Sequence, residues 1–421
     1  HPAASAFVAA ILDILVRSTW CPAHAYLRIY LATDGPRGMV TLGMSAADVF
    51  PISEDSGSPL RAWLRCHARV ITFTVLGLVI LCVFWFGSRY PALLMKAHHA
   101  KQPLASMAFS REVLPTTIHD PLLVRILFGA LNWLSSMAIG MTFGLLFGAL
   151  IHTVLQYRPL RIGQNYTLNS LKGALIGVPM GVCANCAVPM ACGLTRGHGR
   201  VEVALGYLFS SPNFNPVVIA ITFTLLPWYF GAVKYLVFLF VILALVPQLI
   251  RFLERRSALT EFQVSADSAS CSVEAPDLAC SEPFTVTSGQ VLRNYAKHIW
   301  MLFKPTITLM VIASLASSTL LVVIPWHALL ESMSGWRLLA ASFLGVFMPV
   351  PIALDVLFAG ELFRSGISAG YTMMFLMTLG TYSVIPAVYL WREVSRTVAI
   401  TLFAFFLVAG VCLGLLFAAL A

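Results

Sequence analysis

The sequence predicts an all-α, polytopic membrane protein with about eight to ten transmembrane helices, each of which needs about 20 apolar residues. The first observation is the composition, because hydrophobic residues make up 59% of the 421 residues and charged residues only 11%. A soluble domain usually has about 25% charged residues, so this chain has too few charges to cover a water-facing surface. The second is a mean hydropathy of +0.84, and the third is that the apolar residues form long runs. The chain is therefore expected to be integral to the cell (inner) membrane.

The first part of the chain differs from the rest. Residues 1–69 contain turn signals such as Asp34-Gly35-Pro36, which are typical of loops. They are expected to form an extramembrane N-terminal region. Residues 70–121 are predicted to contain the first transmembrane helix, Val70–Gly87, and a loop.

Two longer membrane regions follow, at residues 122–254 and 293–421. Their continuous spans are predicted to be Leu122–Ile151, Ala232–Ile250, Leu302–Ile324 and Thr397–Leu420. Their other apolar stretches, which Gly, Pro, Asn or Cys interrupt, are Leu171–Leu194, Val201–Phe230, Leu338–Leu362 and Ala369–Leu390. Interrupted helices leave backbone groups that lipid cannot satisfy, so they are tolerated only where protein buries them or where they line a watery cavity. We therefore expect broken or re-entrant helices along a transport path.

A polar linker, residues 255–292, separates these two regions. Within it, Ser257–Gln290 contains five acidic residues and no Lys or Arg, and it is rich in Ser, Ala and Thr. This composition is typical of a disordered or loosely folded segment. Arg255 and Arg293 are among the basic residues on its flanks, and basic residues beside membrane spans favour the cytoplasmic side. The linker is therefore predicted to be cytoplasmic.

The two membrane regions resemble each other at an offset of 168 residues. Gly177 and Arg196 in the first region correspond to Gly345 and Arg364 in the second. The arginines are the stronger matches because the segments around them carry few charges, although chance similarity between Gly-rich membrane helices is the alternative. The regions are therefore predicted to be transmembrane repeats 1 and 2, which form two pseudo-symmetric halves.

The sharpest local motif is the pair Cys183 and Cys186, which lies between Pro179 and Pro189. Two cysteines three residues apart share one face of a helical turn, so both thiols can reach one ligand. Thiolates bind soft species such as trivalent arsenic or Cu(I), which makes both residues candidate substrate and metal ligands. Asn185, between them, is a further candidate contact. The alternative is that the cysteines only pack inside an apolar helix.

A second motif contains Ser211, Asn213 and Asn215, with Pro212 and Pro216 among them. Such a stretch cannot be a continuous helix that faces lipid. It is predicted to be a break at membrane level, with the three polar side chains lining the substrate path. A helix that begins near Pro216 would turn its positive N-terminal end towards that gap. The alternative is a short turn outside the membrane.

Repeat 2 has no cysteines at the matching segment but carries Asp355, Glu361 and Arg364. Charged side chains within a span are costly and by default mark a functional site. Asp355 and Glu361 are therefore candidates for coupling transport to protons. The alternative for Glu361 is an ion pair with Arg364 at a helix end, because the two lie three residues apart.

Several functions are not expected. No Lys follows a Gly and no His-Glu-x-x-His occurs, which argues against a P-loop ATPase and a zinc protease. The net charge of +9 comes from 27 Lys and Arg that lie mostly beside apolar runs, as in residues that orient a membrane protein, so nucleic-acid binding is not expected. The chain is predicted to be a transporter without a cofactor, and not an enzyme.

Between Cys183 and Pro216 the sequence resembles the predicted-permease family that includes the organoarsenical (methylarsenite) efflux permeases of the ArsP type. The matching features are the Pro- and Gly-flanked cysteine pair, Gly193-Leu194 and the break at the end of Leu208–Pro216. The two similar halves and the polar linker also fit, and the similarity extends from Leu122 to the C-terminus. The family pattern is Cys-Ser-Cys-Gly, whereas two residues separate the cysteines here.

The resemblance implies secondary-active export, by alternating access, of a small thiophilic solute such as a trivalent organoarsenical or a soft metal species. It also implies that this chain hydrolyses no ATP. Two alternatives remain open: a membrane-embedded thiol-disulfide oxidoreductase that uses Cys183 and Cys186, and a passive channel. The expected partners are the solute and the lipid bilayer, and a homo-oligomer is left open.

Overall fold

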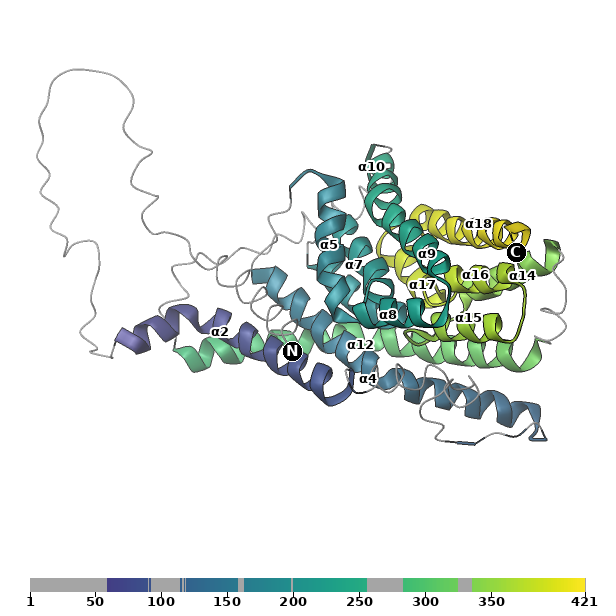
Figure 1. Ribbon diagram of the computed structural model, residues 1–421. Coiled ribbons are helices and arrows are strands. Elements are labelled where there is room, and N and C mark those ends of the chain that lie inside the picture. The colour runs from purple at the N-terminus through teal and green to yellow at the C-terminus, as the bar shows by residue number, and fades with distance from the viewer. Residues whose placement is uncertain are drawn as a thin grey trace, which may run out of the picture. The chain divides into compact units, whose positions relative to one another are not determined.

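The computed structural model describes residues 59–89, 91, 114–115, 117, 119–157, 163–197, 200–255, 283–324 and 335–420. The chain divides into two units, His1–Ala62 and Trp63–Ala421, and the described helices belong to the second apart from the first turn of α2. In these residues every regular element is a helix and no strand occurs (Figure 1). The predicted all-α fold is confirmed. Most of the expected extramembrane region lies outside the described residues.

Five helical segments in the described ranges are long and apolar enough to cross a membrane. They are His67–Ser88, Leu122–Tyr157, Trp228–Arg255, Phe284–Val323 and Arg396–Leu420. A pair of shorter helices, Val201–Asn213 and Pro216–Leu225, is bent by 44° and adds a sixth if it forms one span. The prediction of a polytopic membrane protein is therefore confirmed. The predicted eight to ten transmembrane helices are reached only when other half-length helices are also counted.

The first half follows α2 (Pro59–Phe84) and the π-helical turn η1 (Trp85–Arg89). It has a long helix, four half-length helices and a final long segment, which are α4 (Leu122–Tyr157), α5 (Tyr166–Met180), α6 (Ala184–Arg196), α7 (Val201–Asn213), α8 (Pro216–Leu225) and the run α9 (Trp228–Phe240), η3 (Val241–Leu245) and α10 (Val246–Arg255).

The second half has the same order of long and half-length helices. Its elements are α12 (Phe284–Val323), α14 (Gly335–Phe347), α15 (Leu354–Arg364), α16 (Ala369–Thr378), α17 (Val384–Glu393) and α18 (Arg396–Leu420). Helix boundaries also match at the offset of 168 residues. Arg196 and Arg364 end α6 and α15, and Pro216 and Val384 begin α8 and α17.

Helix α12 begins at Phe284, inside the range that the sequence assigned to the linker. Thr287 and Val291 in its first turns are buried, and Ser288 Oγ lies 3.0 Å from Thr72 Oγ1 of α2. Packing therefore holds these residues in a helix although their composition is polar. Helix α10 ends at Arg255, where the linker was expected to begin.

The two longest helices, α4 and α12, lie side by side and antiparallel. Near the end of α12, Ser318 Oγ donates to the carbonyl oxygen of Ile126, 2.8 Å away near the start of α4. At the opposite ends, Thr153 Oγ1 and His298 Nδ1 are 2.8 Å apart. We call the end of the helical bundle at which α4 begins the Ile126 end, and the end at which α4 finishes the Tyr157 end.

Helices α5 and α6 form a hairpin that enters and leaves the bundle at the Tyr157 end. The guanidinium of Arg200, just before α7, lies 4.8 Å from the ring centre of Tyr166, the first residue of α5. Helix α6 runs along α4 and finishes beside Leu155, which lies 2.7 Å from the position that a Cβ on Gly197 would occupy. The α5–α6 hairpin is therefore re-entrant.

Helices α14 and α15 form a second hairpin, which enters from the Ile126 end. Near the end of α15, Phe363 packs edge to face on Phe230 in the first turn of α9, with ring centres 5.6 Å apart. Helix α10 packs against α5 at the Tyr157 end, so the start of α9 lies at the other end. The start of α14 lies beside Gly414 near the end of α18, whose Phe417 also contacts Phe230 at 4.8 Å.

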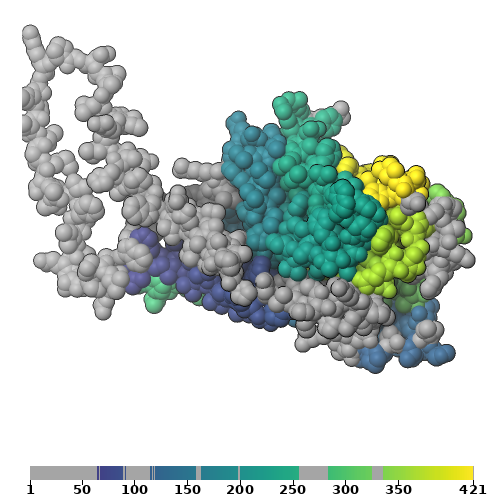
Figure 2. All heavy atoms as spheres, in the orientation of Figure 1, coloured from purple at the N-terminus to yellow at the C-terminus, as the bar shows by residue number. Residues whose placement is uncertain are grey.

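The tips of the two hairpins meet in the interior. The Trp133 indole N–H of α4 donates to the carbonyl oxygen of Pro349 in the second tip, 2.9 Å away. Helix α8 packs on α15, and α6 packs on α17. In each half, therefore, the second and the fourth half-length helices make the contact with the other half. In the space-filling view the teal to green surface around residues 200–250, in the first half, adjoins the yellow-green surface around residues 350–390, in the second half (Figure 2).

Candidate functional site

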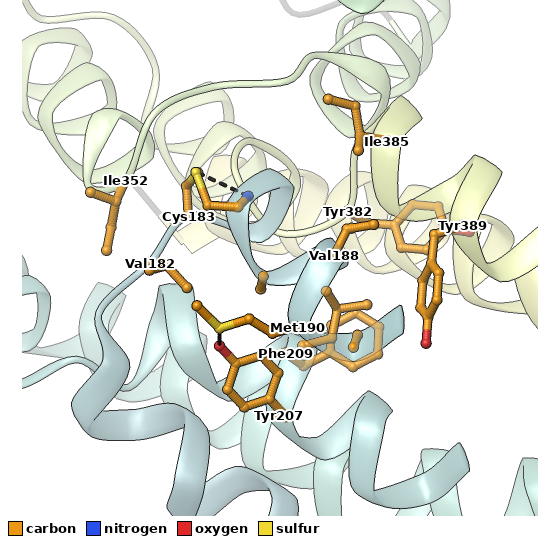
Figure 3. Close-up of a cluster of buried hydrophobic side chains, with 14 of the residues drawn as sticks. Val182, Cys183, Val188, Met190, Tyr207, Phe209, Ile352, Tyr382, Ile385 and Tyr389 are labelled. Carbon is orange, nitrogen blue, oxygen red and sulfur yellow. Dashed lines mark hydrogen bonds between the residues drawn. The ribbon is translucent and has the colours of Figure 1, made fainter. Parts of the chain in front are cut away.

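Cys183 and Cys186 lie at the tip of the first hairpin. Gly181 has a φ of 58°, which lets it cap the C-terminus of α5 in a left-handed conformation and turn the chain towards α6. Cys183 is the N-cap of α6, and its Sγ accepts a hydrogen bond from the Cys186 backbone N–H at 3.3 Å (Figure 3). The two cysteines are 4% and 2% exposed. Both therefore lie inside the protein and do not face lipid.

Two methionines, Met137 and Met190, lie in the same buried hydrophobic cluster as this pair. The Cys183 thiol donates to Met137 Sδ of α4 at 4.0 Å. One turn further along α4, a Cβ on Gly140 would come 2.8 Å from Cys186 Sγ, so the glycine leaves room for the second thiol. The buried Met190 accepts a hydrogen bond from the Tyr207 hydroxyl. Thiol and thioether sulfur are donors that soft metal and metalloid species prefer.

The described ranges hold no group of three or more His, Cys, Asp or Glu that could bind a metal ion. Cys183 and Cys186 would therefore need a further soft donor to complete a metal site. Met137 supplies the thioether sulfur placed against Cys183. The arrangement suits a solute with an affinity for sulfur better than a hard cation, which prefers oxygen ligands.

Asn185 connects this tip to the second half of the chain. Its Oδ1 accepts a hydrogen bond from Ser383 Oγ at 2.5 Å, and its Nδ2 donates to the carbonyl oxygen of Val350 at 3.4 Å. Ser383 is the N-cap residue of α17, and Val350 belongs to the second hairpin tip. Figure 3 draws Ile352 and Ile385 of the second half in one buried hydrophobic cluster with Cys183. The predicted contact residue Asn185 thus lies where the halves meet.

The predicted break after Asn213 is present, and it adjoins the cysteine tip. Ser211 Oγ lies 3.3 Å from the backbone N and 3.4 Å from the carbonyl oxygen of Val182. Asn215 is the N-cap of α8, and a Cβ on Gly181 would come 2.5 Å from its Nδ2. The structure therefore brings Ser211 and Asn215 to the tip. The Asn213 amide instead donates to the carbonyl oxygen of Phe209 in its own helix, at 2.9 Å.

Four half-length helices begin at these interior breaks. The first residues of α6, α8, α15 and α17 follow breaks in the chain. The N-termini of α6 and α17 meet through Asn185 and Ser383, that of α8 lies at the first hairpin tip, and that of α15 lies at the break before α17. Helix N-termini carry partial positive charge and favour electron-rich groups. At the second tip, Ala353 is the N-cap of α15 and has a φ of 63°. A left-handed alanine is strained, and such strain gathers at functional sites.

Asp355, the candidate coupling acid, forms a buried ion pair with Lys234 of α9. The Lys234 side chain is 0% exposed and that of Asp355 is 9% exposed. Sequence analysis missed Lys234 because it looked for charges only in the interrupted stretches. The available signal was that Lys234 is the one charged residue between Trp228 and Ile250.

Glu361, the other candidate for coupling, lies further along α15 and does not take part in this pair. Its Oε2 is 4.0 Å from the Arg364 guanidinium in the same helix, and both side chains are more than a third exposed. This is the ion pair that the sequence offered as the alternative. A coupling role for Glu361 remains a prediction, with the geometry favouring Asp355.

Comparisons with known proteins bear on this arrangement. The sequence profile of the ArsP_1 family, described as a predicted permease, matches residues 126–419, so the match begins in α4, ends in α18 and includes both hairpins. The chain is also similar to the UPF0718 protein YraQ of Escherichia coli (strain K12). The two are 24% identical over 276 residues, which is 64% of this chain and 74% of the relative. No solved structure matches the chain.

Proposed function

Because the chain belongs to the ArsP_1 family of predicted permeases, we propose that it is a secondary-active permease that exports a small thiophilic solute across the inner membrane. Family membership identifies a membrane permease and not an enzyme, and the five long apolar helices fit that identity. The solute, the direction of transport and the mechanism are parts of the proposal.

The observation that carries the proposal is the burial of Cys183 and Cys186 at a hairpin tip that touches the other half of the chain. Binding a solute there requires the two halves to move apart, because the tip is closed in this structure. A trivalent organoarsenical or a soft metal species could bind the two thiols, with Met137 beside them. Asn185, Ser211 and Asn215 would form the polar wall of the site, with Asn213 one turn away in α7.

The mechanism we propose is alternating access between two pseudo-symmetric halves. Their matching helix order, and hairpins that enter from opposite ends, support an inverted internal repeat. In transporters of this architecture the solute site lies at the repeat interface near the midplane, and one half rocks against the other. We infer that the cysteine tip, which contacts the second half through Asn185, occupies that position here.

Uptake into inverted vesicles tests this function, with a panel of trivalent arsenicals, soft metals, and sulfur or selenium anions. We expect saturable uptake that responds to a proton gradient. The Cys183→Ser/Cys186→Ser variant should lose it while its level in the membrane is unchanged. The matched control is Cys82→Ser/Cys412→Ser, because both of these cysteines are exposed. Unchanged uptake in the first variant would remove the thiol mechanism.

The same assay separates the two other functions. A passive channel would give flux that does not saturate and that survives collapse of the proton gradient. A thiol-disulfide oxidoreductase would give no solute uptake and would form a mixed disulfide with a partner. Thiol exchange requires access to the thiolate, so with Cys183 and Cys186 buried this reaction, like solute binding, would require the halves to open, and the mixed disulfide is what distinguishes it.

A further inference from the structure

Lys234 and Asp355 form an ion pair in the interior that solute binding at the cysteine tip does not require. The Lys234 side chain has no exposed surface, and Asp355 is 9% exposed. The desolvation of two charges can cost more than a buried ion pair returns, and apolar side chains in place of such a pair are often at least as stable. Charges held within membrane spans by default mark a functional site.

The pair connects the two halves close to the cysteine tip. Lys234 lies on α9 in the first half, and Asp355 lies in the first turn of α15, directly after the second hairpin tip. A Cβ on Gly380, in the break between α16 and α17, would be 3.6 Å from Asp355 Cγ. Any movement that separates the halves must therefore change the distance between the ammonium and the carboxylate.

The surroundings of Asp355 contain few other titratable groups. Helix α9 supplies Lys234 and Tyr235, and α16 supplies Tyr371, while α8 has no titratable side chain. On α15 itself, the remaining charged residues pair with each other at the opposite end of the helix. Within the described ranges, Lys234 is the group whose charge balances the Asp355 carboxylate.

We propose that Lys234 and Asp355 form an electrostatic switch that couples proton binding to the opening of the interface between the two halves. This inference rests on the proposed alternating-access function. A hydronium ion in the open path transfers its proton to the Asp355 carboxylate: an O–H bond of the hydronium breaks, an O–H bond forms on Asp355 and removes its charge, and water leaves. Lys234 then lacks a counter-charge in an apolar interior, which strongly disfavours the closed state. Loss of that proton to water restores the ion pair and favours closure.

Two variants separate the switch from simple packing. Asp355→Asn imitates the protonated acid and strands the Lys234 charge, so it should favour the open state. Lys234→Met/Asp355→Asn removes both charges and keeps side chains of similar size, so it should remain closed at every pH. The matched pair therefore differs in one buried charge, which is the quantity that the proposal concerns.

The opening can be measured without any solute by the rate at which a thiol reagent labels Cys183 and Cys186. The full chain is used, with the remaining cysteines replaced by serine. At neutral pH, Asp355→Asn should label at least about tenfold faster than the background chain, a shift that corresponds to about 1.4 kcal/mol. Lys234→Met/Asp355→Asn should label as slowly as the background. On acidification the labelling rate of the background chain should rise relative to that of this double variant. The ratio of the two rates at one pH cancels the change in thiolate fraction.

Two results would overturn the switch. One is Asp355→Asn labelling as slowly as the background chain at neutral pH, and the other is no gain of the background chain over the double variant on acidification. If Asp355→Asn does not fold, the second comparison decides alone. Labelling does not depend on transport, so failure of the vesicle assay with the labelling result intact would remove the proposed solute function and leave the switch. If the vesicle assay shows the expected uptake but the labelling result fails, the permease function stands and the switch is removed.

Discussion

Arg196, the last residue of α6, and Glu393, the last residue of α17, form a two-point ion pair that joins the two halves of the chain at the Tyr157 end. Arg196 Nε donates to Glu393 Oε2 at 2.8 Å, and a second guanidinium nitrogen donates to Oε1. Arg364, at the equivalent position of the second half, is paired with Glu361 in its own helix. Arg196 therefore links the two halves, whereas Arg364 forms an ion pair within its own helix.

Arg196→Ala should lower the stability of the folded chain. It leaves the mostly buried Glu393 carboxylate without its charge-assisted hydrogen bonds, a loss of about 1–3 kcal/mol. Arg364→Ala is the matched control and should cost at most about 1 kcal/mol, because it removes an exposed pair within one helix. The midpoint of unfolding of the purified protein measures both. Equal shifts would show that the cross-half pair contributes no more than the exposed one.

Asn185 and Ser383 should be energetically coupled. Their side chains are hydrogen-bonded at 2.5 Å across the interface between the halves. A double-mutant cycle with Asn185→Ala and Ser383→Ala should therefore give a coupling energy of about 0.5–3 kcal/mol in unfolding experiments. Asn185→Ala with Ser365→Ala is the control cycle, because the Ser365 hydroxyl donates to carbonyl oxygens in the last turn of α15, the helix that it caps. Additive effects in both cycles would contradict the contact.

Gly148→Ala should disrupt the packing of α4 on α6. A Cβ at this position would lie 2.4 Å from the carbonyl oxygen of Pro189, so the two backbones would have to separate. We expect a loss of about 1–3 kcal/mol, as in other overpacked interiors. Gly289→Ala is the control, since nothing lies within 4 Å of its Cβ position, and alanine in a helix should stabilise by about 0.5–1 kcal/mol. The midpoint of thermal unfolding measures both variants. Equal midpoints would contradict the close approach of the two backbones at Gly148.

The interruptions of the helices could be predicted because their causes are local. Gly181 ends α5 since it tolerates a left-handed conformation, and Asn215 with Pro216 begins α8 since these residues suit the start of a helix. Both features are visible in a few neighbouring residues. For the same reason, the cysteine tip and the second break were found from the sequence.

The partners of these residues could not be predicted in this way. Lys234 and Asp355 lie 121 residues apart in the chain, and the sequence carries no local signal that they meet. The return of α6 to the end where α5 entered depends on its packing along α4. The polar first turns of α12 are held as a helix by tertiary contacts, which override what their composition alone indicates.

The buried lysine also has a consequence for how the protein is made. Synthesis delivers α9 before α15, so the ribosome releases a span with a bare ammonium group whose acidic counterpart has not yet been translated. Until α15 arrives, that span has to keep its charge near the lipid headgroups, as lysines near the ends of spans do. Maturation of the N-terminal half is thus tied to completion of the C-terminal half, and the two halves produced as separate polypeptides should be stable only when they are produced together.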